Sequence, residues 1–302
     1  MKSKFAVYAL LAVMPLLFAS NLIIGRASAG LVEPWTLAFW RWTIAAAILT
    51  VFAWRGIVAS WSSLRGASRE IVILGVLGMF VCGGVVYASL HSTTATNATL
   101  IYTASSFIIV ILDATFFGQR LTWTRIAGII LGFVGAATIV LQGELHRLIA
   151  LEFNLGDIGI AFCAIAWAVY SVMLKAERLR SLPTWPLFAL ISIAGVITLV
   201  PPMLYEAVAL DAFPRSRNAW LSIAALAILP SVLAYGFFQV GVREVGPSVA
   251  GIFFYLNPVY GVLLAWLFLG ESFHVYHAIG LVLVVGGVVL ATNPFLKGPA
   301  RS

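Results

Sequence analysis

Aromatic and neutral polar side chains gather in the middle of long apolar segments of this sequence. Trp167 and Tyr170 share one segment, and Tyr235 and Gln239 share another. A tryptophan in the middle of an apolar segment is unusual, because its N–H group prefers a wet or hydrogen-bonded position. Uncharged rings and amides can bind a small polar solute in a cavity, and core packing is the competing interpretation for each ring. The candidate binding residues are Asn21, Tyr87, Tyr102, Trp167, Tyr170, Tyr235, Gln239, Tyr255 and Asn257.

Three prolines, Pro15, Pro230 and Pro258, fall near the middle of three of these segments. A proline inside a helix removes a backbone donor and frees a carbonyl group one turn earlier. At membrane depth such irregular backbone is tolerated only where protein or a water-filled cavity satisfies it. We interpret the three prolines as helix breaks that gate a cavity, and simple kinks packed against neighbouring helices are the alternative.

Formal charge inside the apolar segments is confined to Arg41 and Asp113, with Glu271 at a segment end. An ionisable group at such a position is a candidate for function. By helix rise, Arg41 and Asp113 differ in depth by roughly 15–20 Å, so they cannot pair. Asp113 either reaches toward Arg120 or a neighbouring loop, which we favour, or carries a proton. The role of Arg41 is left open.

Motifs of catalysis and of phosphate binding are missing from the sequence. It has no Gly-x-Ser-x-Gly, no Walker loop and no His-Glu-x-x-His. Cys82 and Cys163 lie in different segments without a neighbouring histidine or carboxylate cluster, and we interpret them as small packing residues. We therefore expect no catalytic residue, no metal site and no cofactor, so that function depends on a cavity.

Ten apolar segments must position these residues. Hydrophobic residues make up 62% of the 302 positions and charged residues 10%, against roughly 45–50% and about 25% in an average soluble domain. Each segment is near the roughly 20 residues that a helix needs to cross a hydrocarbon core. The sequence predicts an all-α integral membrane protein with ten transmembrane helices in a lipid bilayer. The segments are 5–24, 35–54, 71–90, 95–117, 123–141, 155–174, 185–204, 220–241, 248–269 and 275–292.

The chain contains an internal duplication. Residues 98–140 align without a gap on residues 250–292, and the identities include Gly118 with Gly270 and Gly128 with Gly280. Earlier parts of the halves align at an offset of 149, where Pro34 matches Pro183. Each half holds five segments, and an odd number of crossings makes the second half enter from the opposite side. We therefore predict two inverted five-helix repeats, in domains 1–150 and 151–302.

Basic residues are distributed unequally between the two sides. With the N-terminus inside, thirteen of the eighteen Lys and Arg residues fall in cytoplasmic segments and four in outer segments. The positive-inside rule places both termini in the cytoplasm. The net charge of +7 follows from this asymmetry and needs no nucleic-acid partner. Gly128 and Gly132 form a close-packing motif that is either internal or a dimer face, so the oligomeric state is left open, with a monomer as the simplest case.

Several motifs resemble the EamA-type repeats of the drug/metabolite transporter superfamily. These motifs are Phe39-Trp40-Arg41-Trp42 followed by Ala45-Ala46-Ala47, Gly118-Gln119-Arg120-Leu121, Leu269-Gly270-Glu271-Ser272 and Leu256-Asn257-Pro258. Within that family the chain is most similar to the YddG-type amino-acid exporters. The resemblance implies that Trp167, Tyr170 and Tyr102 line a central cavity and that segments five and ten are peripheral. The family turn usually reads Leu-Gly-Glu-Arg, so Gln119 and Ser272 depart from it.

These observations lead to a functional hypothesis. The chain is expected to be a secondary transporter in the plasma (bacterial inner) membrane that exports aromatic or hydrophobic amino acids by alternating access through a cavity between the halves. A phosphate or nucleotide-sugar carrier needs deep basic residues, and a cationic-drug exporter needs a buried glutamate. Export of other small solutes or drugs of the same superfamily and a non-transporting membrane scaffold are the alternatives. We expect the Trp167 ring to face the cavity.

Overall fold

The computed structural model describes residues 4–28, 30–119, 121–144, 154–269 and 272–292. Within these ranges the chain is helical with short connections and contains no strand. Ten helical stretches of the described chain are long and apolar enough to cross a membrane. The predicted all-α architecture with ten spans is confirmed. Arg120 and Glu271 lie outside the described residues.

The first five spans run from α1 to α8. Their helices are α1 (Lys4–Ala27), α2 (Pro34–Ala59), α3 (Trp61–Gly66), α4 (Ser68–Gly75), η1 (Val76–Val85), α5 (Val86–Leu90), α6 (Ala95–Thr103), α7 (Ser105–Phe117) and α8 (Trp123–Val140). The remaining spans run from α10 to α17. Their helices are α10 (Leu155–Met173), α11 (Glu177–Arg180), α12 (Thr184–Ala209), α13 (Arg217–Leu226), η2 (Ala227–Ala234), α14 (Tyr235–Val245), α15 (Pro247–Ile252), η3 (Phe253–Tyr255), α16 (Leu256–Leu269) and α17 (Val275–Thr292).

Four spans are interrupted near their middle, and the interruptions correspond between the halves. The third and eighth spans change from α-helix to π-helix in η1 and η2. The fourth span breaks between α6 and α7 at Ala104, and the ninth passes through the short 3-10 turn η3 before Leu256. Ala104 and Leu256 are equivalent at the repeat offset of 152. π-helical turns are rare and frequently mark functional sites.

The three predicted helix breaks have different outcomes. Pro15 lies inside α1, which continues as an α-helix on both sides of it. Pro230 lies in η2, and Pro258 follows the 3-10 turn in the first turn of α16. η1 contains no proline. Its π-helical turns occur in a glycine-rich stretch in which every residue keeps its backbone N–H group. The proline pattern therefore located the irregular backbone of spans eight and nine and missed that of spans three and four.

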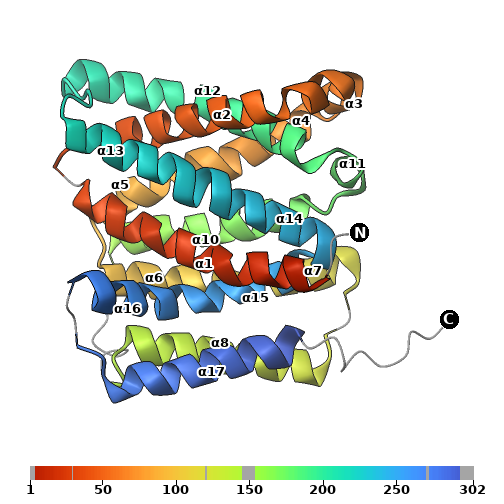
Figure 1. The fold of residues 1–302 in the computed structure, drawn as a ribbon, viewed down its shortest axis with the longest axis vertical. Helices are drawn as coiled ribbons and strands as arrows, with labels where there is room; N and C mark the ends of the chain where they lie inside the picture. Colours follow the sequence, from red (N-terminus) through yellow and green to blue (C-terminus); the bar gives the residue numbers. More distant parts are fainter. Residues whose placement is uncertain (1–3, 29, 120, 145–153, 270–271, 293–302) are drawn as a thin grey trace.

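Several helices extend beyond the predicted segments, and two short helices lie outside them. The short helices α3 and α11 connect spans at the end of the molecule where α1 begins (Figure 1). The seventh span extends past its predicted end at 204 to Ala209. This extension places the buried carboxylate of Glu206 against the start of α2, where it accepts hydrogen bonds from the backbone N–H of Trp35 (3.1 Å) and Thr36 (2.8 Å). The free N–H groups and the dipole of a helix start favour a negative charge there.

Equivalent helices of the two halves pack in antiparallel pairs. A Cβ atom added at Gly128 would lie 2.6 Å from the backbone of Ala291, and one at Gly287 would lie 2.4 Å from the backbone of Gly132. These approaches run in opposite directions along α8 and α17. They show that the Gly-x-x-x-Gly motif of span five is an internal contact. α2 and α12 are also antiparallel, because Gly56 meets Pro186 and Thr36 meets Glu206. Antiparallel pairing is the geometry that an inverted duplication requires.

In the view of Figure 1 the long helices lie one above another with their axes roughly parallel or antiparallel. The pair α8 and α17 forms one edge, as the resemblance implied, and the pair α2 and α12 forms the other. The helices α1, α10, α6, α7 and α13 to α16 lie between these pairs, together with α5. α1 begins and α17 ends at the same end of the molecule, as an even number of crossings demands.

Candidate functional site

A cluster of aromatic rings occupies the middle of the molecule around Trp167. The side chain of Trp167 is 1% exposed. Its ring stacks on that of Tyr170 with 5.4 Å between centroids. It meets four further rings at 4.8–5.8 Å, and these belong to Phe18, Tyr235, Phe238 and Phe254. Helices α1, α10, α14 and the turn η3 each contribute at least one ring, so the cluster joins both halves of the chain.

The local helix geometry brings these rings together. Trp167 and Tyr170 are three residues apart on α10, and Tyr235 and Phe238 are three apart on α14, so each pair lies on one helix face. Glycines of η1 allow the rings to approach the backbone. A Cβ atom at Gly78 would lie 2.8 Å from the Tyr170 ring. The Tyr235 hydroxyl donates a hydrogen bond to the Gly78 carbonyl oxygen at 2.9 Å.

Two polar pairs flank the rings, one from each half of the chain. On one side the Tyr87 hydroxyl donates a hydrogen bond to Asn21 Oδ1 at 2.6 Å. On the other side Gln239 Nε2 donates to the Tyr170 hydroxyl at 3.0 Å. At the repeat offset of 149, Asn21 is equivalent to Tyr170. Phe18 is likewise equivalent to Trp167, and their rings touch. The cluster is therefore arranged about the symmetry of the duplication.

The polar pair of the first half also holds Arg41. Arg41 Nη1 donates to Asn21 Oδ1 at 3.0 Å and to the Tyr87 hydroxyl. Its guanidinium carbon lies 5.1 Å from the centroid of the Trp42 ring, and that ring meets Tyr235 at 5.0 Å. A cation, two polar groups and the aromatic cluster are thus contiguous.

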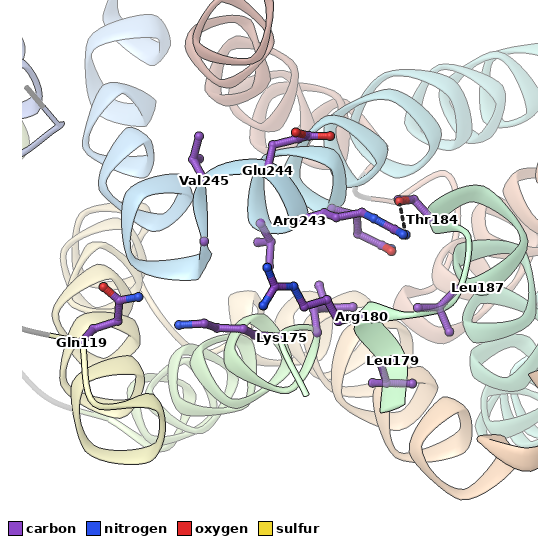
Figure 2. Close-up of a pocket in the computed structure, with 13 residues that line it drawn as sticks. Gln119, Lys175, Leu179, Arg180, Thr184, Leu187, Arg243, Glu244 and Val245 are labelled. Carbon is purple, nitrogen blue, oxygen red and sulfur yellow. Dashed lines mark hydrogen bonds between the residues drawn. The ribbon is translucent and has the colours of Figure 1, made fainter. Parts of the chain in front are cut away.

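A pocket of about 240 Å³ reaches the other side of the cluster. It opens where the residues after α10, helix α11 and the start of α12 meet α14 (Figure 2). Gln239 of α14 is one of its lining residues. Because Gln239 also bonds Tyr170, this pair forms the boundary between the pocket and the rings. Figure 2 shows Lys175 and Arg180, from the segment after α10, and Arg243, from α14, around the opening. The lining thus holds three basic residues and one acidic residue, Glu244.

Asp113 joins three spans beside this opening. It forms an ion pair with Lys175 at 2.8 Å and accepts a hydrogen bond from the Ser248 hydroxyl. The side chain of Asp113 is 2% exposed and that of Lys175 is 18% exposed. The partner of Asp113 is thus a residue of a neighbouring loop, one of the alternatives considered above, and Arg41 has separate partners. Arg243 donates to the carbonyl oxygen of Leu182 and to Thr184 Oγ1.

The opposite end of α10 is also tied to the first half. Asp157 accepts hydrogen bonds from Asn97 Nδ2 at 3.1 Å and from the Thr93 hydroxyl, and it caps α10 together with Asn154. These bonds join the start of α10 to the start of α6. Of the two ends of α10, the one at Lys175 borders the pocket and the one at Asp157 is bonded across to the other half.

The structure brings together most, but not all, of the residues that the sequence nominated. Tyr102 lies against Cys82 on the flank of the cluster. Tyr255 points away from the centre, because its ring packs on Phe107 and on Gly132 of α8. Asn257 lies in the first turn of α16, and its Oδ1 atom is buried without a hydrogen-bond partner.

The environment of Trp167 differs from the expectation of a ring that faces water. The neighbouring rings fill the space around it in this conformation, and its Nε1 atom has no hydrogen-bond partner. Sequence reasoning did not nominate Phe18, Phe238 and Trp42 as site residues; a phenylalanine in an apolar segment carries no polar signal, and Trp42 entered only as part of a family motif. The internal duplication could have identified Phe18, because Phe18 occupies the position equivalent to Trp167.

Comparisons with known proteins agree with this architecture. Residues 5–141 and 154–293 match the EamA-like transporter family. The chain is 26% identical over 274 residues to the uncharacterized transporter YyaM of Bacillus subtilis, covering 89% of this chain and 88% of that protein. It is 27% identical over 288 residues to the aromatic amino acid exporter YddG of Ancylobacter novellus, covering 92% and 94%.

A solved crystal structure has the same fold, with a TM-score of 0.78 and 24% sequence identity over 96% of this chain and 97% of the other. The family match extends over both halves and nearly the whole described chain. The chain therefore belongs to the EamA-like transporter family, and it is a multi-pass membrane transporter.

Proposed function

We propose that the protein exports amino acids with aromatic or large apolar side chains across the bacterial inner membrane by alternating access. The observation that carries this proposal is the ring cluster around Trp167, flanked on each side by an uncharged hydrogen-bonding pair. Rings provide a π surface for an aromatic side chain, and the flanking groups provide hydrogen bonds for a polar backbone. The similarity to an aromatic amino acid exporter supports the same substrate class.

The proposed orientation places the pocket on the cytoplasmic side. The end of the molecule that carries Arg65, Arg178, Arg180 and Arg243 is richer in basic residues than the end that carries Arg215, so the positive-inside rule assigns it to the cytoplasm. A cysteine replacing Ser63 should then be protected from an impermeant maleimide in intact cells, and one replacing Ser216 should be labelled. The reverse labelling pattern is incompatible with this orientation.

The arrangement of α10 suggests how access alternates. Its Lys175 end borders the open pocket, and its Asp157 end is bonded to α6. We infer that the structure corresponds to a conformation open toward the cytoplasm, in which the rings around Trp167 pack against one another. Rocking of symmetry-related spans would open the Asp157 side and close the Lys175 side, as in other inverted-repeat transporters.

Counterflow in proteoliposomes tests the function. Vesicles loaded with unlabelled tryptophan and diluted into labelled tryptophan should accumulate label, and phenylalanine should compete while glycine should not. Trp167→Ala should abolish the signal. Trp123→Ala is the matched control, because Trp123 is 85% exposed on the surface. If labelled tryptophan, phenylalanine, tyrosine and leucine all fail to enter vesicles that contain folded protein, the proposed substrate class is wrong.

A further inference from the structure

Arg41 is a buried cation without a counter-charge. The residue is 2% exposed inside the second span, and its Nε atom has no hydrogen-bond partner. Its recorded partners, Asn21 and Tyr87, are both neutral. Among the described residues, no carboxylate forms an ion pair with it. An unpaired charge in this environment is costly, and intramembrane charges of this kind are usually retained for function.

The buried carboxylates of the described chain have other partners. Glu206 accepts bonds from the start of α2, Asp157 from Asn97 and Thr93, and Asp113 pairs with Lys175. A guanidinium group has five N–H donors in a planar fork that matches a carboxylate. The hydrogen bonds of Arg41 within the described chain use only Nη1. The group therefore keeps donors available for an anionic ligand.

Arg41 lies directly beside the ring cluster. Its guanidinium carbon is 5.1 Å from the Trp42 centroid and 5.4 Å from the Tyr87 centroid. The Trp42 ring meets Tyr235, which in turn meets Trp167 at 5.1 Å. A ligand with a negative group at one end and a ring at the other could therefore contact Arg41 with the first and the ring cluster with the second.

The duplication singles out Arg41 further. Phe18 and Asn21 have aromatic or polar equivalents in the second half, as described above. The position equivalent to Arg41 at the offset of 149 is Leu190, a partly buried apolar residue. Arg41 is therefore a buried charge that the equivalent position of the second half lacks. A symmetric scaffold needs no such charge, and an asymmetric ligand explains it.

We propose that Arg41 binds the carboxylate of the transported solute, while Asn21 and Tyr87 position its guanidinium group. This inference deepens the proposed function and rests on it for the location of the site. The carboxylate then points toward the end of the molecule opposite to the pocket, and the side chain lies among the rings. The substrates are accordingly carboxylates, and the corresponding amides are excluded.

Ligand-induced thermal stabilisation tests the inference without transport. Purified protein in detergent is heated with phenylalanine or phenylacetate, and with the matched amides phenylalaninamide or phenylacetamide. The carboxylates should raise the melting temperature of the wild type and the amides should not. In Arg41→Gln the apparent dissociation constant for the carboxylates should rise at least about 10-fold, because a hydrogen bond to a charged group is lost. Arg41→Lys should retain part of the affinity, and Arg215→Gln, at an exposed position, should behave as wild type.

A purely structural role predicts different results. If Arg41 only holds spans together, Arg41→Gln should melt at a lower temperature without ligand, and the folded fraction should bind carboxylates normally. If Arg41 serves the ligand, the empty variant should be as stable as wild type or more stable, because a buried unpaired charge has been removed. Equal binding of phenylacetate and phenylacetamide by the wild type would also overturn the inference.

The two proposals fail in distinguishable ways. If the wild type moves no amino acid but phenylacetate stabilises it and does not stabilise Arg41→Gln, the substrate class proposed above is wrong and the carboxylate site stands. If the wild type and Arg41→Gln move tryptophan with the same affinity, the function stands and the role of Arg41 is refuted. Uptake and melting are measured on the same preparations.

Discussion

Replacement of Trp167 by alanine should lower the stability of the protein and remove its transport activity together. Trp167 is 1% exposed and meets five other rings at 4.8–5.8 Å. A ring facing water would be dispensable for stability, and that was the expectation from the sequence. Because the indole is packed among five rings, its removal leaves a cavity, and we therefore expect the variant to be less stable than the wild type.

The expected magnitude follows from the packing. Truncation of a buried tryptophan to alanine costs about 3–5 kcal/mol of the free energy of unfolding. Trp167→Phe should cost far less, about 1 kcal/mol. The variant keeps an aromatic ring in the cluster. It also removes the Nε1 donor, which has no partner in this conformation, and a buried donor without a partner destabilises the folded state by about 1–3 kcal/mol. Phenylalanine also occurs naturally at the equivalent position, Phe18.

Equilibrium unfolding by sodium dodecyl sulfate in mixed micelles measures these differences. Trp167→Ala should unfold at a markedly lower detergent fraction than wild type, and Trp167→Phe and the surface control Trp123→Ala should stay close to it. In counterflow, Trp167→Phe should change the affinity for tryptophan by a few-fold, since an aromatic contact contributes roughly 0.5–1.5 kcal/mol. A Trp167→Ala protein that unfolds with the wild type would refute the packed cluster as the resting arrangement.

Two further predictions concern the contacts that surround the cluster. Lys175→Met should lower the melting temperature more than Asp113→Asn. The first variant leaves the Asp113 carboxylate, whose side chain is 2% exposed, without its cation, whereas the second leaves the Lys175 ammonium group, whose side chain is 18% exposed and borders the pocket. The double variant should recover part of the loss, and equal effects of the two single variants would argue against a buried pair. Gly287→Ala should destabilise the α8–α17 contact, because its Cβ would lie 2.4 Å from the Gly132 backbone. The neighbouring Gly286→Ala should be tolerated, because its Cβ would lie 3.7 Å from the nearest atom, in the side chain of Leu131. Similar melting temperatures for the two variants would contradict the antiparallel packing.

Sequence reasoning predicted the fold better than the site, for physical reasons. Span number follows from apolar length, and length is set by the thickness of the bilayer, so ten spans were predictable. The π-helix η1 was not, because glycine-rich backbone without proline gives no breaking signal. Trp167, Tyr170, Tyr235 and Gln239 were nominated by polarity at mid-span depth, and the structure brings them together.

The failures at the site have a common cause. Polarity identifies depth along a helix but not the direction in which a side chain points. Tyr255 lies at the nominated depth, yet its ring packs against Gly132 of α8 and leaves the centre to its neighbour Phe254. The partner of Asp113 was equally inaccessible from sequence, since Lys175 becomes adjacent only when α10 packs on α7. Both outcomes depend on helix rotation, which tertiary packing decides.

The duplication supplies information that neither polarity nor packing gives alone. Two halves that arose by duplication carry side chains of related chemistry at equivalent positions, and Phe18 with Trp167 and Asn21 with Tyr170 are such pairs. A difference in charge between equivalent positions is not explained in this way. Arg41, at the border of the ring cluster, is charged, and its equivalent Leu190 is not. A small solute with one anionic end and one apolar end has the same asymmetry, and this agreement is the reason to look for the substrate's carboxylate at Arg41 and for its side chain at Trp167.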